Sequence, residues 1–103
     1  RLLSQLDRLG DGSGVSDLAA AIGVDQPRAS RVIADCAARG LVARASDPAD
    51  ARRTLVTLTP AGRAVLDERR RERRAAVERA LDGFTAEERT LLAALLARFV
   101  AAA

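Results

Sequence analysis

Apolar residues recur at helical spacing along most of the chain and alternate with polar residues in only one short part. The first apolar stripe predicts a short helix that Gly10 would end, and its members are Leu2, Leu3, Leu6 and Leu9. Residues 11–14 have the composition of a turn. A second short helix should follow, with Ser16 as its N-cap and Asp17 in its first turn. Gly23 suits its C-terminal cap.

The third predicted helix runs from Asp25 to Gly40. The Asp25 carboxylate can accept a hydrogen bond from the Arg28 N–H, and Pro27 falls in the first turn, where a missing N–H costs nothing. Arg39 and Gly40 supply a cation and a flexible residue at the C-terminal end. The second and third helices are about three to four residues apart, which matches the helix-turn-helix geometry that places the second of two helices in the DNA major groove.

The two faces of this third helix differ in chemistry. Its apolar face carries Ala29, Val32, Ile33 and Cys36. The outward side begins with polar or small residues, which are Gln26, Pro27, Arg28, Ser30 and Arg31. Such a face suits contact with base edges and phosphates, whereas a merely solvated helix more usually carries pairs of Glu and Lys. Two exposed arginines are weak evidence alone, so the prediction depends on the surrounding elements.

Two short strands are predicted at residues 41–44 and 54–58. Residues 45–53 between them are polar, include a proline and end in two arginines. As the wing of a winged helix-turn-helix, this segment could place an arginine in the minor groove, where the electrostatic potential is most negative. As an ordinary mobile loop, it would pair its arginines with Asp47 and Asp50. The loop sequence by itself favours this second interpretation.

Two helices are predicted in the rest of the chain. Thr59 and Pro60 supply an N-cap and a first helical residue for a long helix that reaches about to Leu81. Its highly charged middle, residues 68–74, is interpreted as a solvated stretch whose arginines pair with neighbouring carboxylates. We therefore do not assign this arginine run to DNA.

The last helix opens with a capping box formed by Thr85 and Glu88. It carries an apolar stripe that is wider than a terminal helix of a small domain needs, made of Leu91, Leu92, Leu95, Leu96, Phe99 and Val100. The excess predicts a partner helix, most simply from a second copy of the chain. A helix that folds back onto its own domain is the competing interpretation.

Composition narrows the classes of function. The net charge of +3 permits a nucleic-acid partner without demanding one. Every basic residue is arginine, and a GC-rich coding sequence explains the lack of lysine better than function does. With no histidine and one cysteine, we expect no enzyme active site, no cofactor and no metal site. The single cysteine fits a reducing cytoplasm, and no segment is long and apolar enough to span a membrane.

The sequence from Ser16 to Leu66 closely resembles the MarR family of transcriptional regulators. In the wing, the matching residues are the Asp50-x-Arg52 pair and the later Leu58-Thr59. In the helix-turn-helix, the matching segments are Ser16-Asp17-Leu18-Ala19, Gly23-Val24, Gln26-Pro27 and Arg39-Gly40-Leu41-Val42. The resemblance implies a mainly α winged helix-turn-helix with a small β-hairpin wing, and a homodimer in which terminal helices of both chains intertwine.

The resemblance also implies roles for individual residues. Each recognition helix would read half of a palindromic operator, Arg52 would enter the minor groove, and Asp50 would hold a recognition-helix arginine such as Arg31. Many members repress transcription and leave DNA when a small, often aromatic, effector binds. The family's first helix and much of its second are absent here, so the chain is expected to be N-terminally incomplete. Some relatives sense oxidants through a cysteine in that region, whereas Cys36 is interpreted as a packing residue.

We predict two regions: a DNA-binding lobe at residues 1–59, with the helix-turn-helix at 16–39 and the wing at 41–58, and dimerisation helices at 60–103. DNA contacts are expected from Ser16, Gln26, Pro27, Arg28, Ser30, Arg31, Arg52, Arg53 and Thr54, with Asp50 in a supporting salt bridge. The predicted function is a cytoplasmic, ligand-responsive repressor that binds double-stranded DNA as a homodimer. The alternative is a winged-helix module for protein–protein contact without sequence-specific DNA binding.

Overall fold

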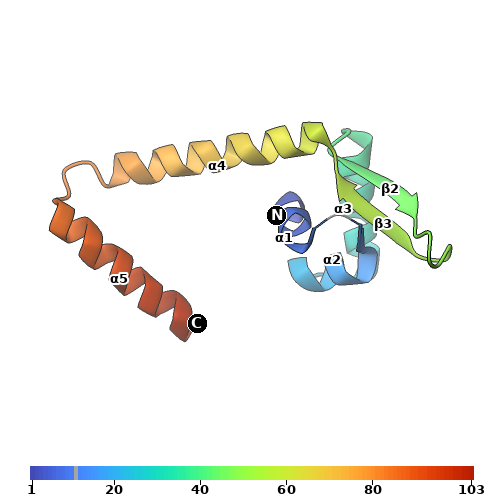
Figure 1. The fold of residues 1–103 in the computed structure, drawn as a ribbon, viewed down its shortest axis with the longest axis horizontal. Helices are drawn as coiled ribbons and strands as arrows, with labels where there is room; N and C mark the ends of the chain where they lie inside the picture. Colours follow the sequence, from blue (N-terminus) through green and yellow to red (C-terminus); the bar gives the residue numbers. More distant parts are fainter. Residues whose placement is uncertain (11) are drawn as a thin grey trace. The chain divides into compact units, whose positions relative to one another are not determined.

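The computed structural model describes residues 1–10 and 12–103. Along the chain its elements are α1 (Leu2–Leu9), β1 (Ser13–Gly14), α2 (Val15–Ile22), α3 (Gln26–Ala38), β2 (Val42–Ser46), β3 (Thr54–Leu58), α4 (Pro60–Ala80) and α5 (Ala86–Ala102) (Figure 1). This order confirms the predicted winged helix-turn-helix. The chain forms two compact units, residues 1–69 and residues 70–103, which are described separately below.

The sheet of the first unit has three antiparallel strands in the order β1-β3-β2, where the sequence predicted a two-stranded hairpin. β2 pairs with β3 along its whole length. Ser13 and Gly14 were predicted as part of a turn, but they pair with Val56 and Leu55 of β3. Residue 11 of that predicted turn lies outside the described residues. Local sequence does not reveal β1, because its backbone groups find their partners on a strand far along the chain.

α2 begins at Val15, so the predicted N-cap role of Ser16 is wrong. Gly14 is the N-cap, and no side chain caps this helix. Gly14 belongs to β1 and pairs with Leu55 of β3, so the chain passes directly from the strand into the helix. Ser16 therefore falls in the first turn of α2, where it is exposed and its hydroxyl is available to other residues.

Helices α1, α2 and α3, the sheet and the start of α4 enclose one apolar core. Its buried members are Leu2, Leu3, Leu6, Leu18, Ile33, Val42, Val56 and Leu66. Ala29 is also buried, and Val32 and Cys36 pack against the core, which confirms the predicted apolar face of α3. The outward residues of α3 are correspondingly exposed. The core therefore fixes which side of α3 faces solvent.

The two ends of α3 are formed by local signals that the sequence predicted. The Asp25 carboxylate accepts a hydrogen bond from the Arg28 N–H at 2.8 Å. At the other end Gly40 adopts a left-handed conformation with φ of 75°. This conformation lets the Gly40 and Leu41 N–H groups reach the carbonyls of Ala37 and Cys36, at 3.0 and 2.9 Å. Specific hydrogen bonds thus define both ends of the predicted recognition helix.

The start of α4 is held closely against the turn between α3 and β2. The Thr59 hydroxyl donates to the Gly40 carbonyl at 2.6 Å and accepts from the Gly62 N–H at 3.0 Å. Gly62 is buried, and a Cβ there would overlap the Leu41 carbonyl oxygen and lie 2.8 Å from Leu58 Cδ1. Only glycine allows the helix to approach the backbone of the neighbouring turn this closely.

We expect Gly62→Ala to lower the free energy of unfolding by about 1–3 kcal/mol, because the added methyl group meets backbone that cannot rotate away. Urea unfolding followed by circular dichroism measures this change. Ala61→Ser, at the exposed neighbouring position, should change the free energy of unfolding by less than about 0.5 kcal/mol. Equal stabilities of wild type and Gly62→Ala would contradict the close approach.

In the second unit, the end of α4 and α5 are joined by a short turn. The predicted capping box is present: the Glu88 N–H donates to the Thr85 hydroxyl at 3.1 Å, and the Thr85 N–H donates to the Glu88 carboxylate at 2.8 Å. Arg89 ties the two helices together, since its guanidinium contacts Glu78 at 3.3 Å and the Leu81 carbonyl at 3.0 Å. No residue of α5 is buried.

Candidate nucleic-acid interface

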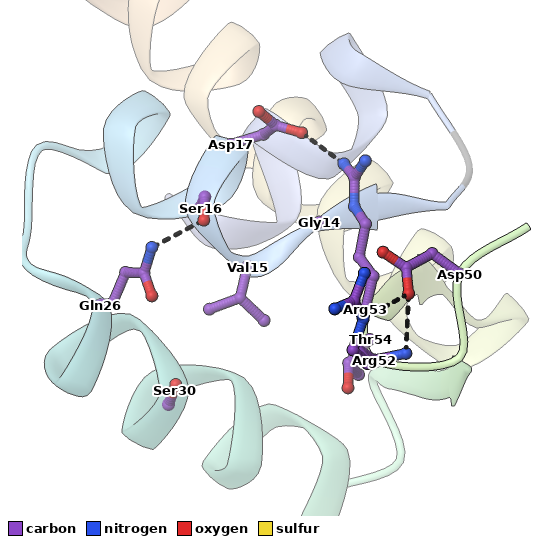
Figure 2. Close-up of a pocket in the computed structure, with 10 residues that line it drawn as sticks. All are labelled: Gly14, Val15, Ser16, Asp17, Gln26, Ser30, Asp50, Arg52, Arg53 and Thr54. Carbon is purple, nitrogen blue, oxygen red and sulfur yellow. Dashed lines mark hydrogen bonds and ion pairs between the residues drawn. The ribbon is translucent and has the colours of Figure 1, made fainter. Parts of the chain in front are cut away.

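A groove of about 810 Å³ lies between the start of α2, the first turns of α3 and the base of the wing. It is lined by Gly14, Val15, Ser16, Asp17, Gln26, Ser30, Asp50, Arg52, Arg53 and Thr54 (Figure 2). Seven of these residues belong to the set named from the sequence, and the fold brings them together from three separate segments. Gly14, Val15 and Asp17 were not predicted as site residues.

Gln26 and Ser16 connect the two helices of the helix-turn-helix. The Gln26 Nε2 atom donates a hydrogen bond to the Ser16 hydroxyl at 2.6 Å. Figure 2 shows the Gln26 amide oxygen turned away from Ser16. Because the hydroxyl accepts this bond, its own hydrogen is free to donate to another acceptor. Ser16 therefore orients Gln26 in a groove at the edge of α3, a role that the sequence did not reveal.

The wing between β2 and β3 is closed by hydrogen bonds of its own. The Asp47 N–H donates to the Arg53 carbonyl at 2.8 Å, and the Arg53 N–H donates to the Asp50 carbonyl at 2.9 Å. The Asp50 carboxylate accepts from the backbone N–H of Arg52 at 3.1 Å and from its side-chain Nε at 3.2 Å. The Arg52 side chain is 92% exposed. Its two terminal nitrogens, which make no hydrogen bond within the described residues, project from the wing.

Arg53 points in a different direction from Arg52. Its Nη2 atom forms an ion pair with the Asp17 carboxylate in the first turn of α2, at 2.9 Å. To reach Asp17, the side chain lies across Gly14, where a Cβ would come within 2.6 Å of Nη2. Figure 2 shows Arg53 running from the wing past Gly14 to Asp17. This contact spans 36 positions of sequence, so no local pattern could have predicted it.

Three of the predicted DNA-contacting residues lie outside the groove. Pro27, Arg28 and Arg31 are exposed on the outward side of α3. Across residues 1–10 and 12–103, no carboxylate lies within ion-pair distance of the Arg28 or Arg31 guanidinium. Asp50, for which the family resemblance suggested Arg31 as a partner, contacts Arg52. The outward side of α3 therefore carries two cations that are available to an external anion.

The stripe predicted for dimerisation is exposed in α5. The exposed fractions are 60% for Leu91, 49% for Leu95, 53% for Leu96, 72% for Phe99 and 70% for Val100, while Leu92 is partly covered. Burying a side chain of this size gains about 1.5–3 kcal/mol. Contiguous apolar surface of this kind is unusual on a monomer and is typical of an interface.

Cys36 is partly buried on the inner side of α3, as expected for a packing residue. Burial, followed by the charge of the neighbouring Asp35, raises the pKa of its thiol above the usual value. The reactive thiolate is therefore scarce at neutral pH. Among the described residues, no cluster of three or more His, Cys, Asp and Glu side chains is placed to hold a metal ion. The helices of the described chain include none with the length and hydropathy of a membrane span.

Comparisons with known proteins agree with this arrangement. The model of the MarR family matches residues 1–53. The HTH-type transcriptional regulator YdgJ of Bacillus subtilis is 35% identical over 83 residues, which cover 81% of this chain and 51% of YdgJ. The HTH-type transcriptional regulator YxaD of the same organism is 34% identical over 97 residues, covering 94% of this chain and 67% of YxaD. The chain thus spans between half and two thirds of the length of these relatives.

A solved structure shows the same similarity in three dimensions. The structure of BpsR from Bordetella bronchiseptica superimposes with a TM-score of 0.66 at 33% identity, covering 96% of this chain and 70% of that one. BpsR is described as a protein whose DNA binding is regulated by 6-hydroxynicotinic acid. With the fold, the wing residues and these similarities taken together, the chain belongs to the MarR family of winged helix-turn-helix transcriptional regulators.

Proposed function

We propose that this protein is a sequence-specific DNA-binding repressor that acts as a homodimer and responds to a small effector. The groove carries this proposal, because it gathers Gln26, Ser30 and Arg52 beside the exposed side of α3. Amide and hydroxyl groups next to cations can hydrogen-bond base edges and neutralise phosphates in one interface. α3 would lie in the major groove and the wing in the adjacent minor groove.

The DNA-contacting set divides by the kind of contact its members can make. Gln26, Arg28 and Arg31 have the donors for base edges in the major groove. Ser16, Ser30 and Thr54 carry hydroxyls suited to phosphate oxygens, and Pro27 shapes the start of α3. Arg52 would enter the minor groove, and Asp50 supports its guanidinium through Nε. Whether Arg53 can contact DNA depends on its ion pair with Asp17.

Dimerisation would use the exposed stripe of α5. Its five exposed apolar side chains favour a self-complementary interface with a second copy, of the kind that two-fold symmetric dimers share. A two-fold dimer places its recognition helices about 10 base pairs apart, or a multiple of that, so the operator should be a palindrome. The effector class is suggested by BpsR, which is 33% identical and is regulated by an aromatic acid.

Selection from a pool of random DNA duplexes at physiological salt tests the proposal. We expect enrichment of one two-fold symmetric sequence, with half-sites spaced as the dimer geometry requires. Adding a panel of aromatic acids should then weaken binding of the enriched duplex. If no duplex is favoured over bulk DNA, the chain is better described as a winged-helix module for protein–protein contact.

We expect Arg52→Ala to weaken binding to the enriched duplex and to reduce the slope of log affinity against log salt by about 1.8, because the dimer loses one phosphate-type contact, worth about 0.9, from each protomer. Fluorescence anisotropy at several salt concentrations measures both quantities. Arg73→Ala removes the same charge from the exposed arginine run of α4 and should leave the slope unchanged. The reverse pattern would indicate that the DNA contact is made by α4 rather than by the wing.

A further inference from the structure

The charges of the groove cancel within the free protein. Four charged side chains line it, and they form two ion pairs, Arg52 with Asp50 and Arg53 with Asp17. A site for a polyanion would ordinarily present uncompensated positive charge, because phosphate binding depends on the release of counterions by unpaired cations. The pairing of each arginine therefore affects how strongly the groove attracts DNA.

The two pairs differ in which nitrogen they use. Arg52 contacts Asp50 through Nε, and its side chain is 92% exposed, so its terminal nitrogens can reach a phosphate while the pair persists. Arg53 contacts Asp17 through a terminal nitrogen, Nη2, and its side chain is 50% exposed. To reach the DNA backbone, the Arg53 guanidinium must leave Asp17 or share its donors with it.

Gly14 makes the Arg53 pair possible. The guanidinium lies over this residue so closely that a Cβ would be 2.6 Å from Nη2 and 2.8 Å from Nε. Gly14 is also fixed in space, because it belongs to β1, pairs with Leu55 and caps α2. Asp17 lies in the first helical turn that follows. The backbone thus provides a defined seat that holds the Arg53 side chain beside the Asp17 carboxylate.

We propose that Asp17 competes with the DNA backbone for Arg53 and thereby restrains sequence-independent binding of DNA. The proposal rests on the proposed DNA-binding function and adds a residue that limits it. In the free protein Asp17 neutralises Arg53 and turns it toward α2, so Arg53 contributes no phosphate contact to weak, non-specific complexes. Arg52, whose terminal nitrogens stay free, supplies the wing contact in both specific and non-specific complexes with DNA.

The test compares Asp17→Asn with the wild-type chain on a fluorescent duplex of random sequence. The asparagine keeps the size of the side chain but loses the charge that holds Arg53. We expect tighter binding and a salt slope steeper by about 1.8, because one more arginine of each protomer in the dimer reaches a phosphate. A slope steeper by about 1.8 means that, over the fourfold change in salt, the gain in affinity should be about 12-fold larger at 50 mM than at 200 mM.

Two further comparisons separate the release of Arg53 from a simple loss of negative charge. In an Arg53→Gln background, Asp17→Asn should change the slope by much less than about 1.8, since there is no arginine to release. Asp35→Asn removes the carboxylate of another exposed pair, with Arg39 at 3.3 Å, and should leave the slope close to that of the wild type. Thermal unfolding of each variant confirms that the fold is retained.

Each result has a distinct meaning. Weaker binding by Asp17→Asn would show that Arg53 works while it is held by Asp17, and would overturn the proposal. An unchanged slope, or equal changes in both backgrounds or in Asp35→Asn, would also overturn it. If the wild-type chain binds no DNA of any sequence, the proposed function fails first. If the wild type binds and only the Asp17 effect is missing, the proposed function stands without this inference.

Discussion

Replacing two apolar residues of α5 by carboxylates, Leu95→Glu with Phe99→Glu, is expected to convert the protein to a monomer and to weaken operator binding by about 10²–10⁴-fold. In the single chain Leu95 is half exposed and Phe99 is largely exposed, and neither belongs to the buried core, so the substitutions remove interface without removing core. In a two-fold dimer the variant places four unpaired carboxylates between the helices, and burying an unpaired charge is strongly unfavourable. The loss in operator affinity follows because a monomer engages one half-site and forgoes the second, linked binding event.

Sedimentation equilibrium measures the oligomeric state, and anisotropy with the selected duplex measures operator affinity. Ala94→Glu with Ala97→Glu is the matched control, because it adds the same charge on the opposite side of α5 by helical spacing. This control should remain a dimer. A dimeric Leu95→Glu/Phe99→Glu variant would mean that the exposed stripe serves another purpose, such as packing within the chain or against a different partner.

Removing both exposed arginines of α3, in Arg28→Ala/Arg31→Ala, should reduce discrimination between the selected operator and random DNA. A good bidentate contact to a base contributes about 1–3 kcal/mol of discrimination. In a two-fold dimer each contact occurs in both half-sites, so the loss for one residue should reach about 2–6 kcal/mol per operator. Neither guanidinium has a carboxylate partner among the described residues, so the change should leave the fold intact.

Competition binding against single-base variants of the operator locates the effect. Each arginine should relax the preference at one position per half-site, while Arg79→Ala, in the last turn of α4, should relax none. Equal weakening of binding to all operator variants would indicate that Arg28 and Arg31 contact phosphates rather than bases. Unchanged discrimination would mean that the base-reading side of the protein has been wrongly placed.

The features predicted correctly from the sequence are local ones. The Asp25 cap, the left-handed Gly40 and the Thr85–Glu88 capping box each involve residues a few positions apart, which a helix end requires in a fixed order. The division of α3 into inner and outer sides follows from helical periodicity and is equally local. For these features the chemistry of a short segment is sufficient.

The errors share a different cause. Ser13 and Gly14 look like a turn but form β1, because β3 offers them backbone partners. Ser16 looks like an N-cap but lies in the first turn, because β1 leads directly into α2. In both cases a pairing between distant segments outweighed a local preference that is worth only about 1 kcal/mol. The DNA-contacting roles themselves stay predictions that the proposed experiments test.

The sequence by itself therefore determined the helices, the caps of α3 and α5, the polar outer side of α3 and the apolar stripe of α5. Only the tertiary structure decided how the groove is assembled and which charges remain available in it. Arg52 and Arg53 are neighbours of the same type, yet one projects from the wing and the other lies across Gly14 to Asp17. That difference depends on contacts between segments far apart in the chain, which form only when the sheet brings β1 beside β3.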